Sequence, residues 1–202
     1  MSVRIYVEGG GDSNPLRTEC RRGFAEFFKK VLPAGKQPKV VTCGSRNDAI
    51  EDFCTALRHT RGDQIFLLVD AEGSVPENQT VRNILLASGK WAPSSQVMEE
   101  QTHLMVQCME SWFLADVPTL KTYFGQGFQE SALPKNSRIE TVSKQDVLTA
   151  LKKATRQSKT KGDYSKGEHS FAILALIDPT KVRQASPHAE RLIQTLLQRV
   201  GG

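Results

Sequence analysis

Two short acidic motifs contain the residues of this sequence whose types and spacing best suit chemistry. Glu8 and Asp12 are separated by three glycines, and Asp70 and Glu72 are separated by one alanine. Four carboxylates held close together would repel one another strongly unless a cation neutralised them. Carboxylate oxygens are hard ligands, which suit Mg²⁺ or Mn²⁺ better than zinc. The two motifs therefore predict a site for Mg²⁺ or Mn²⁺, provided that the fold brings them together.

Each motif directly follows a segment that is predicted to be a strand. Residues 3–7 are apolar or β-forming and run into the glycines, while residues 65–69 form a continuous apolar run. A continuous apolar run is typical of a strand that is covered on both faces. In a parallel sheet, the carboxyl ends of the strands lie at one edge, where ligands bind. We therefore expect Glu8 and Asp70 at the same sheet edge.

The remaining elements up to residue 108 alternate between strand and helix. Further strands are predicted at residues 39–42 and 103–108. Helices are predicted to begin at Ser13 or Asn14 and after Ser45, and a third to cover residues 81–87, because capping residues precede apolar residues at helical spacing. This alternation is typical of βαβ units around a parallel, Rossmann-like sheet flanked by helices.

After Glu110 the pattern becomes helical. Helices are predicted at residues 111–115, 117–124, 143–154, 171–177 and 187–200, with a loop over residues 125–142. We expect an α/β core over residues 1–108 and a helical C-terminal portion over residues 109–202, which packs on the core to make one compact unit.

The glycine run Gly9, Gly10 and Gly11 permits positive φ angles and a close approach of the backbone to a ligand. Its N–H groups could therefore bind phosphate oxygens. The run matches neither a Walker loop nor a dinucleotide-binding fingerprint. Taken alone, it is also compatible with an ordinary turn that carries a capping acid.

The composition favours an ordinary globular protein with a basic surface. Of the 202 residues, 39% are hydrophobic and 24% are charged, with a net charge of +5. No stretch approaches the roughly 20 apolar residues that span a bilayer. The four cysteines are scattered without metal-ligand spacing, so we expect reduced thiols and a cytoplasmic location. A basic cluster, which could bind a phosphate backbone or simply form a solvated helix end, contains Lys152, Lys153, Arg156, Lys159 and Lys161, and ends at Lys166.

The two acidic motifs resemble those of the Toprim domain. Residues 7–12, Val-Glu-Gly-Gly-Gly-Asp, resemble its first motif, and residues 68–73, Leu-Val-Asp-Ala-Glu-Gly, resemble its second, with Glu72 where Asp is usual. The resemblance covers about residues 3–108. It implies metal-dependent breaking or making of phosphodiester bonds, with Glu8 as a metal ligand or general acid/base. It further implies that Asp12, Asp70 and Glu72 hold one or two Mg²⁺ ions.

The second half of the chain resembles an uncharacterised bacterial Toprim-like group. The resemblance lies in residues 109–116 and in the segments around Asp178 and Pro187. Such proteins tend to be encoded beside ABC-type ATPases, as in the OLD-type defence systems (overcoming lysogenization defect). Similarity to OLD nucleases implies that Glu110 is a further metal ligand and that Lys166 is a catalytic lysine. Glu110 is also compatible with a plain helix-start acid, and Lys159 or Lys161 could replace Lys166 in this role. His169 and His188 are most simply structural residues.

Three functions are compatible with these features. The first is a Mg²⁺-dependent nuclease acting on DNA or RNA, as the effector of a bacterial defence system. The second is a non-catalytic subunit that docks on a partner ATPase. The departure from the second motif at Glu72 and an exposed-looking segment around Trp112 slightly favour this function. The third is a phosphohydrolase for small phosphorylated molecules, against which the extended basic cluster argues. No membrane association is expected.

Overall fold

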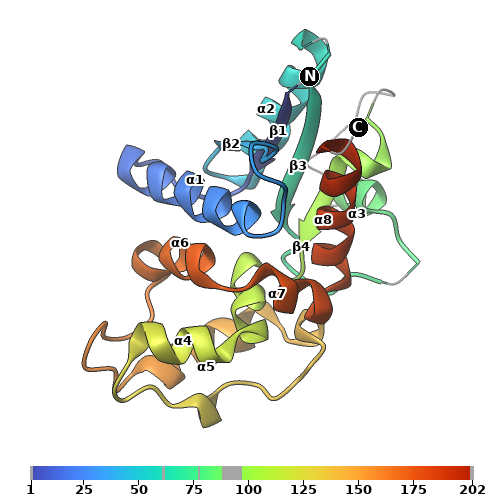
Figure 1. The fold of residues 1–202 in the computed structure, drawn as a ribbon. Helices are drawn as coiled ribbons and strands as arrows, with labels where there is room; N and C mark the ends of the chain where they lie inside the picture. The colour runs from blue at the N-terminus through green and yellow to red at the C-terminus, as the bar shows by residue number, and fades with distance from the viewer. Residues whose placement is uncertain (1, 61, 77, 88–96, 201–202) are drawn as a thin grey trace.

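The four strands of the protein form one parallel sheet. The computed structural model describes residues 2–60, 62–76, 78–87 and 97–200. The strands are β1 (Val3–Val7), β2 (Lys39–Thr42), β3 (Gln64–Asp70) and β4 (Thr102–Met105), in the order β2-β1-β3-β4 (Figure 1). Every adjacent pair is parallel. The α/β fold class that the sequence predicts is therefore confirmed.

The first two helices begin at the capping residues that the sequence marks. The Ser13 hydroxyl accepts a hydrogen bond from the Leu16 N–H at the start of α1 (Asn14–Lys29). At the start of α2 (Arg46–His59), Ser45 and Asp48 form a reciprocal capping box. Both caps satisfy N–H groups that have no partner inside the helix. Local sequence is thus sufficient to fix where these helices start.

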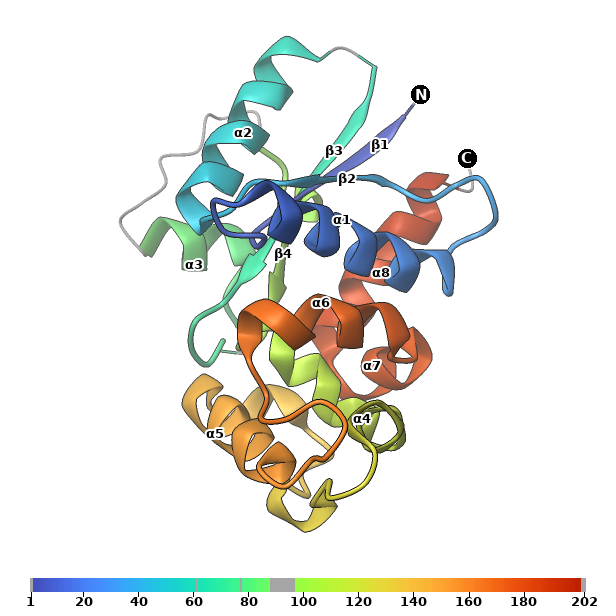
Figure 2. The ribbon, with the colours of Figure 1, turned by 90° about the vertical axis from the view of Figure 1, so that its left-hand side faces the viewer.

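Alternate residues of the strands pack against different helices. Ile5, Val7 and Leu68 belong to a core shared with α1, α6 (Lys166–Leu176) and α8 (Pro187–Val200). Tyr6 and Leu67 belong to a second core shared with α2 and α3 (Val81–Ala87). Figure 2 shows α2 and α3 on one side of the sheet and α1 and α8 on the other. Burial on both faces explains the continuous apolar sequence of β3.

Most of the helical portion lies beyond the carboxyl ends of the strands, whereas α8 runs back beside the sheet (Figure 1). A 3₁₀ turn at Met109–Ala115 leads into it from β4, and its Trp112 ring stacks on Phe27 of α1 with ring centroids 5.1 Å apart. The other elements are α4 (Val117–Phe124), two short 3₁₀ turns (Glu130–Ala132 and Ile139–Thr141), α5 (Lys144–Thr155), α6, α7 (Pro179–Ala185) and α8. One hydrophobic core runs from the sheet through this portion. In the described part of the chain, no helix is long and apolar enough to cross a membrane.

The structure differs from the sequence-based prediction in several places. The strand predicted at residues 103–108 is Thr102–Met105, and the helix predicted at residues 111–115 is part of a 3₁₀ turn. The other differences lie in α6 and α7. Helix α6 begins at Lys166, whereas the apolar pattern begins at Phe171. His169 and Ser170, in this first part of α6, can be buried because each has a hydrogen-bond partner. A search for apolar residues at helical spacing does not detect buried polar residues of this kind. Helix α7 was not predicted; it begins at Pro179 and is capped by Asp178, whose side chain accepts a hydrogen bond from the Thr180 N–H.

Candidate metal centre

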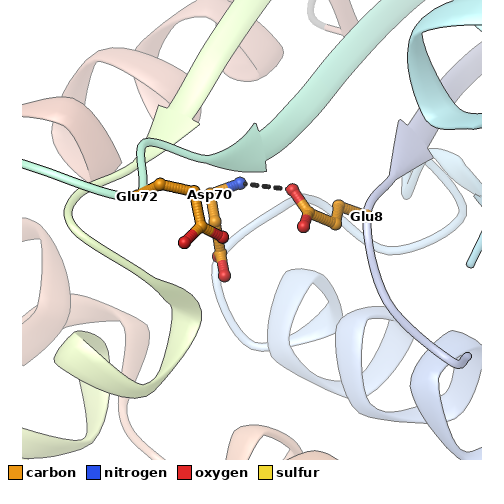
Figure 3. A group of neighbouring side chains, drawn as sticks. All are labelled: Glu8, Asp70 and Glu72. Carbon is orange, nitrogen blue, oxygen red and sulfur yellow. Dashed lines mark hydrogen bonds between the residues drawn. The ribbon is translucent and has the colours of Figure 1, made fainter. Parts of the chain in front are cut away.

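Three of the predicted acids meet at the carboxyl edge of the sheet. Glu8 directly follows β1, Asp70 ends β3, and Glu72 lies two residues beyond it (Figure 3). Each offers a carboxylate oxygen, and these three atoms lie within 4.8 Å of one another. Two oxygens that each lie about 2.1 Å from one Mg²⁺ ion are at most roughly 4.2 Å apart. Small side-chain movements would therefore let the three acids bind one ion.

Hydrogen bonds from the backbone hold the two inner carboxylates in place. The Glu8 carboxylate accepts a bond of 3.0 Å from the Asp70 N–H, drawn in Figure 3. Asp70 Oδ1 in turn accepts a bond of 2.9 Å from the Met109 N–H. These bonds leave other oxygens of both acids free for a cation. The site is thus built between β1, β3 and the 3₁₀ turn that follows β4.

Glu72 reaches the cluster from an unusual backbone conformation. Its φ of 65° lies in the left-handed region, which costs a non-glycine residue about 1–3 kcal/mol. Its N–H donates a bond of 2.8 Å to the Gln107 carbonyl, which helps to hold this conformation. The longer glutamate side chain remains half-exposed, so it can adjust to a ligand.

Burial and neighbouring charges make the cluster receptive to a cation. Asp70 is only 4% exposed, and burial, followed by the nearby Glu8 and Glu110 carboxylates, raises the pKa of Asp70 to about 7. Burial also raises the pKa of Glu8. Both shifts mean that the folded chain disfavours the ionised acids when no cation is bound. A divalent ion would reverse this penalty.

Three basic side chains surround the acids. Lys144 Nζ lies 2.7 Å from both Glu72 oxygens and 3.7 Å from Asp70 Oδ2. Arg46 donates a hydrogen bond to the Asp70 carbonyl oxygen, and its charge offsets part of the rise that burial causes in the pKa of Glu8. Lys166 Nζ lies 3.4 Å from Glu110 Oε1. These cations partly compensate the carboxylates.

Sequence reasoning missed Arg46 and Lys144, although each carries a local signal. Each is the first residue of its helix, α2 or α5. A positive charge there opposes the helix macrodipole, so a basic residue at this position needs another reason to be present. Both residues have partners from a distant part of the chain: Lys144 pairs with Glu72, and Arg46 donates a hydrogen bond to the Asp70 carbonyl oxygen.

Glu110 belongs to a buried network beside the three-acid cluster. It is fully buried, and its Oε1 accepts hydrogen bonds of 3.3 Å from the Tyr164 and Ser170 hydroxyls. Its Oε2 has no hydrogen-bond partner within the described ranges. It is not one of the three acids whose oxygens come within 4.8 Å of one another. The structure therefore places Glu110 where it can hold Lys166 and act on Asp70 through charge.

The glycine loop and α6 enclose a cavity beside the acids. This cavity, which we call the carboxylate cavity, has a volume of about 340 Å³ and is lined by Glu8, Asp70, Gly9, Gly10, Gly11, Lys166 and Gly167, among others. Gly10 has a φ of +87°, and a Cβ atom there would lie 2.8 Å from the Arg17 Cα. Only glycine fits this position. Asp12, the other predicted acid of this loop, is exposed and lies outside the three-acid group.

The comparison with protein families assigns the chain to one family. Residues 7–197 match the family described as a domain of unknown function, DUF4276. The chain is a DUF4276 protein. No curated protein and no solved structure matches it. The matched range contains all the acids and bases of the site described above.

The basic cluster of this DUF4276 chain lies on exposed positions at the end of α5 and in the following loop. Lys161 lies over the Tyr123 ring, 5.1 Å from its centroid. Within the residues that the structure describes, Lys152, Lys153, Arg156 and Lys159 have no carboxylate within 4.0 Å and so form no ion pair. These positive charges therefore remain available to a ligand.

Two other predictions concerned residues away from the acids. In the DUF4276 chain, His169 accepts a hydrogen bond from the Ser165 N–H and His188 pairs with Glu140 at 2.8 Å, so both have structural partners. Trp112 is fully buried against Phe27. The exposed-looking segment that favoured a docking subunit is thus part of the core, and that argument was wrong.

Proposed function

We propose that this DUF4276 protein is a Mg²⁺- or Mn²⁺-dependent nuclease that cleaves phosphodiester bonds in DNA or RNA. The observation that carries the proposal is the meeting of Glu8, Asp70 and Glu72 within 4.8 Å, beside a cavity that also contains Lys166. When bound there, a divalent ion would activate water and polarise a phosphoryl oxygen. The resemblance of the acidic motifs to Toprim nucleases points to the same chemistry.

The balance of charge favours one ion over two. Four carboxylates, from Glu8, Asp70, Glu72 and Glu110, face three cations, from Arg46, Lys144 and Lys166. The site therefore has a formal charge of −1 when all groups are ionised. One divalent ion brings it to +1, which suits an anionic phosphodiester, whereas a second would leave an excess of +3.

Residues at the start of α6 that line the carboxylate cavity can bind the phosphate. Lys166 and Gly167 line the cavity at the start of α6, and their backbone N–H groups have no acceptor in the ranges that the structure describes. Helix N-termini of this kind bind anions through free N–H groups and the macrodipole. The Lys166 ammonium group, held by Glu110, would stabilise the charge that develops on the phosphate oxygens.

The role in bacterial defence and the ABC-type ATPase partner belong to the same proposal and rest on the sequence resemblance alone. A non-catalytic subunit is the second candidate. One observation favours it: the Lys144 ammonium group already neutralises Glu72 and approaches Asp70 as a bound cation would.

The direct test is cleavage of supercoiled plasmid, single-stranded DNA and tRNA, with Mg²⁺ or Mn²⁺, by the wild type and by Glu8→Gln. The glutamine retains an acceptor for the Asp70 N–H but carries no charge. We expect metal-dependent cleavage of at least one substrate by the wild type and none by Glu8→Gln. Absence of metal binding by the wild type in titration calorimetry would support the non-catalytic subunit instead.

Lys144→Met separates the two candidates further. Removing one positive charge beside Asp70 and Glu72 should raise the affinity for Mn²⁺ on the order of tenfold, because the ion no longer competes with the ammonium group. Titration calorimetry measures this affinity. Lys121→Met, which breaks an exposed pair with Glu130, is the control and should leave it unchanged. A fall in Mn²⁺ affinity in Lys144→Met would contradict this account of the site.

Metal binding should also depend on pH through Asp70. With its pKa raised to about 7, Asp70 keeps its proton in the metal-free folded protein at pH 5, and an ion must displace that proton. The same shift makes the metal-free protein lose stability as the pH rises from about 4 to 7, since the unfolded chain releases the proton earlier. Thermal unfolding should therefore show a larger stabilisation by Mg²⁺ at pH 8 than at pH 5. Equal stabilisation at both pH values would exclude Asp70 as a ligand that titrates near 7.

A further inference from the structure

A second cavity lies next to the carboxylate cavity, between α5 and the start of α6. We call it the α5–α6 cavity. It has a volume of about 340 Å³ and is lined by Gln145, Leu148, Thr149 and Lys152 from α5 together with Tyr164, Ser165 and Lys166. Lys166 also lines the carboxylate cavity. Because Lys166 borders both spaces, the two cavities are adjacent.

The lining of the α5–α6 cavity suits a phosphate joined to a less polar group. Two ammonium groups, from Lys152 and Lys166, supply positive charge, and the Thr149 and Ser165 hydroxyls supply hydrogen bonds. Leu148 adds an apolar wall. Within the described residues, no carboxylate lies within 4.0 Å of the Lys152 ammonium group, so its charge is not already compensated. A sugar–phosphate unit combines these same properties.

Lys152 differs in this respect from its neighbour Lys153. Both side chains are exposed on the last turn of α5, but only Lys152 lines the cavity. Successive helix residues point in directions about 100° apart, which places Lys153 on another side of α5. The two lysines have the same charge, are both exposed and lie on the same helix, but only Lys152 contacts the cavity.

We infer that the α5–α6 cavity binds the nucleotide unit next to the phosphodiester that is cleaved, with the phosphate of that unit at Lys152. This inference rests on the proposed nuclease function and adds a preference to it. A ligand that fills only the carboxylate cavity, such as a mononucleotide, lacks the contact with Lys152. The protein thus selects polynucleotides over small phosphate esters.

The test compares Lys152→Gln with Lys153→Gln as its matched control. Fluorescence anisotropy measures the affinity for a labelled single-stranded oligonucleotide of about 10 nucleotides, with Ca²⁺ replacing Mg²⁺, over a series of salt concentrations. We expect Lys152→Gln to weaken binding about tenfold and to reduce the salt slope by about one phosphate contact. Lys153→Gln should weaken binding less than about threefold. A third variant, Thr149→Trp, fills the exposed cavity without changing charge and should also weaken binding about tenfold.

Equal weakening by Lys152→Gln and Lys153→Gln would overturn the inference, because general surface charge would then explain both. Unchanged binding in Thr149→Trp would overturn it as well. Failure of the proposed function gives a different result: the wild type cleaves no nucleic acid, while Lys152→Gln and Thr149→Trp still bind more weakly than Lys153→Gln. If instead the wild type cleaves and the three variants cleave and bind alike, the nuclease function stands and the cavity has no part in it.

Discussion

Asp70→Asn is expected to abolish metal binding and, at the same time, to make the metal-free protein more stable. Asparagine has the shape of the protonated acid, and its Oδ1 can still accept the hydrogen bond from the Met109 N–H. Asp70 is 4% exposed, so the folded protein must bury its charge at high pH. The rise of its pKa from 3.8 to about 7 corresponds to roughly 4 kcal/mol at pH 8, which Asp70→Asn would recover.

Urea denaturation near pH 8 without metal measures this stability, and titration with Mn²⁺ measures binding. We expect the free energy of unfolding to rise by up to about 4 kcal/mol and Mn²⁺ affinity to fall more than about 100-fold, since one of three ligands and its charge are lost. A variant that gains free energy of unfolding but loses Mn²⁺ affinity identifies a residue that serves binding and destabilises the fold.

Asp116→Asn is the matched control for a buried acid with the opposite environment. Asp116 is 1% exposed, and burial alone would raise its pKa. Its pair with Lys181 and the hydrogen bonds that it accepts from Thr119 and the Asp178 N–H outweigh burial, so its pKa is lowered. Here the ionised form is favoured, so Asp116→Asn should reduce stability and leave Mn²⁺ binding intact. If both variants lost stability alike, the acids at the sheet edge would be structural.

Gly23→Ala is expected to have the second large effect. Gly23 lies within α1 where α6 crosses it, and a Cβ atom there would lie 2.7 Å from the Phe171 carbonyl oxygen and 3.2 Å from the Phe171 Cβ. Alanine normally stabilises a helix interior by about 1 kcal/mol relative to glycine. Because the backbone of α6 cannot give way locally, the overlap should outweigh this gain, with a net loss of about 2 kcal/mol.

Thermal unfolding should show this loss as a fall in Tm of roughly 4–8 °C for a chain of this size. The proposed nuclease activity should fall as well, since α6 carries Lys166, Gly167 and Phe171 into the carboxylate cavity. Gly167→Ala is the stability control, because a Cβ atom there meets no heavy atom within 4 Å, and its Tm should be equal or higher. An unchanged Tm in Gly23→Ala would show that α1 and α6 are not held in close contact.

The strands, the first two helices and the ends of β1 and β3 could all be predicted from sequence. Their signals are local: an apolar run for β3, Ser13 and Ser45 as caps, and an acid directly after each strand. Each of these depends on the pattern within a few residues. Parallel pairing of β1 with β3 then brings Glu8 and Asp70 to the same edge without further information.

The surroundings of the acids were decided by contacts between distant parts of the chain. Lys144 reaches Glu72 across 72 residues, and the Tyr164 hydroxyl reaches Glu110 across 54. The polar start of α6 also has a long-range cause, since Ser170 is buried through its bond to Glu110. Periodicity reports only which side of an element is buried, and it carries no information on which partner buries it.

The tertiary structure consequently divides the four acids of the two motifs, and it places Glu110, the fifth acid considered, beside them. Glu8, Asp70 and Glu72 come together, Asp12 stays exposed on the glycine loop, and Glu110 is buried beside them with Lys166. The sequence by itself determined that acids would follow β1 and β3, because strand patterns and sheet geometry are sufficient for that. Only the tertiary structure decided which cations and which cavities surround them, because the helical portion folds back onto the sheet edge through long-range packing.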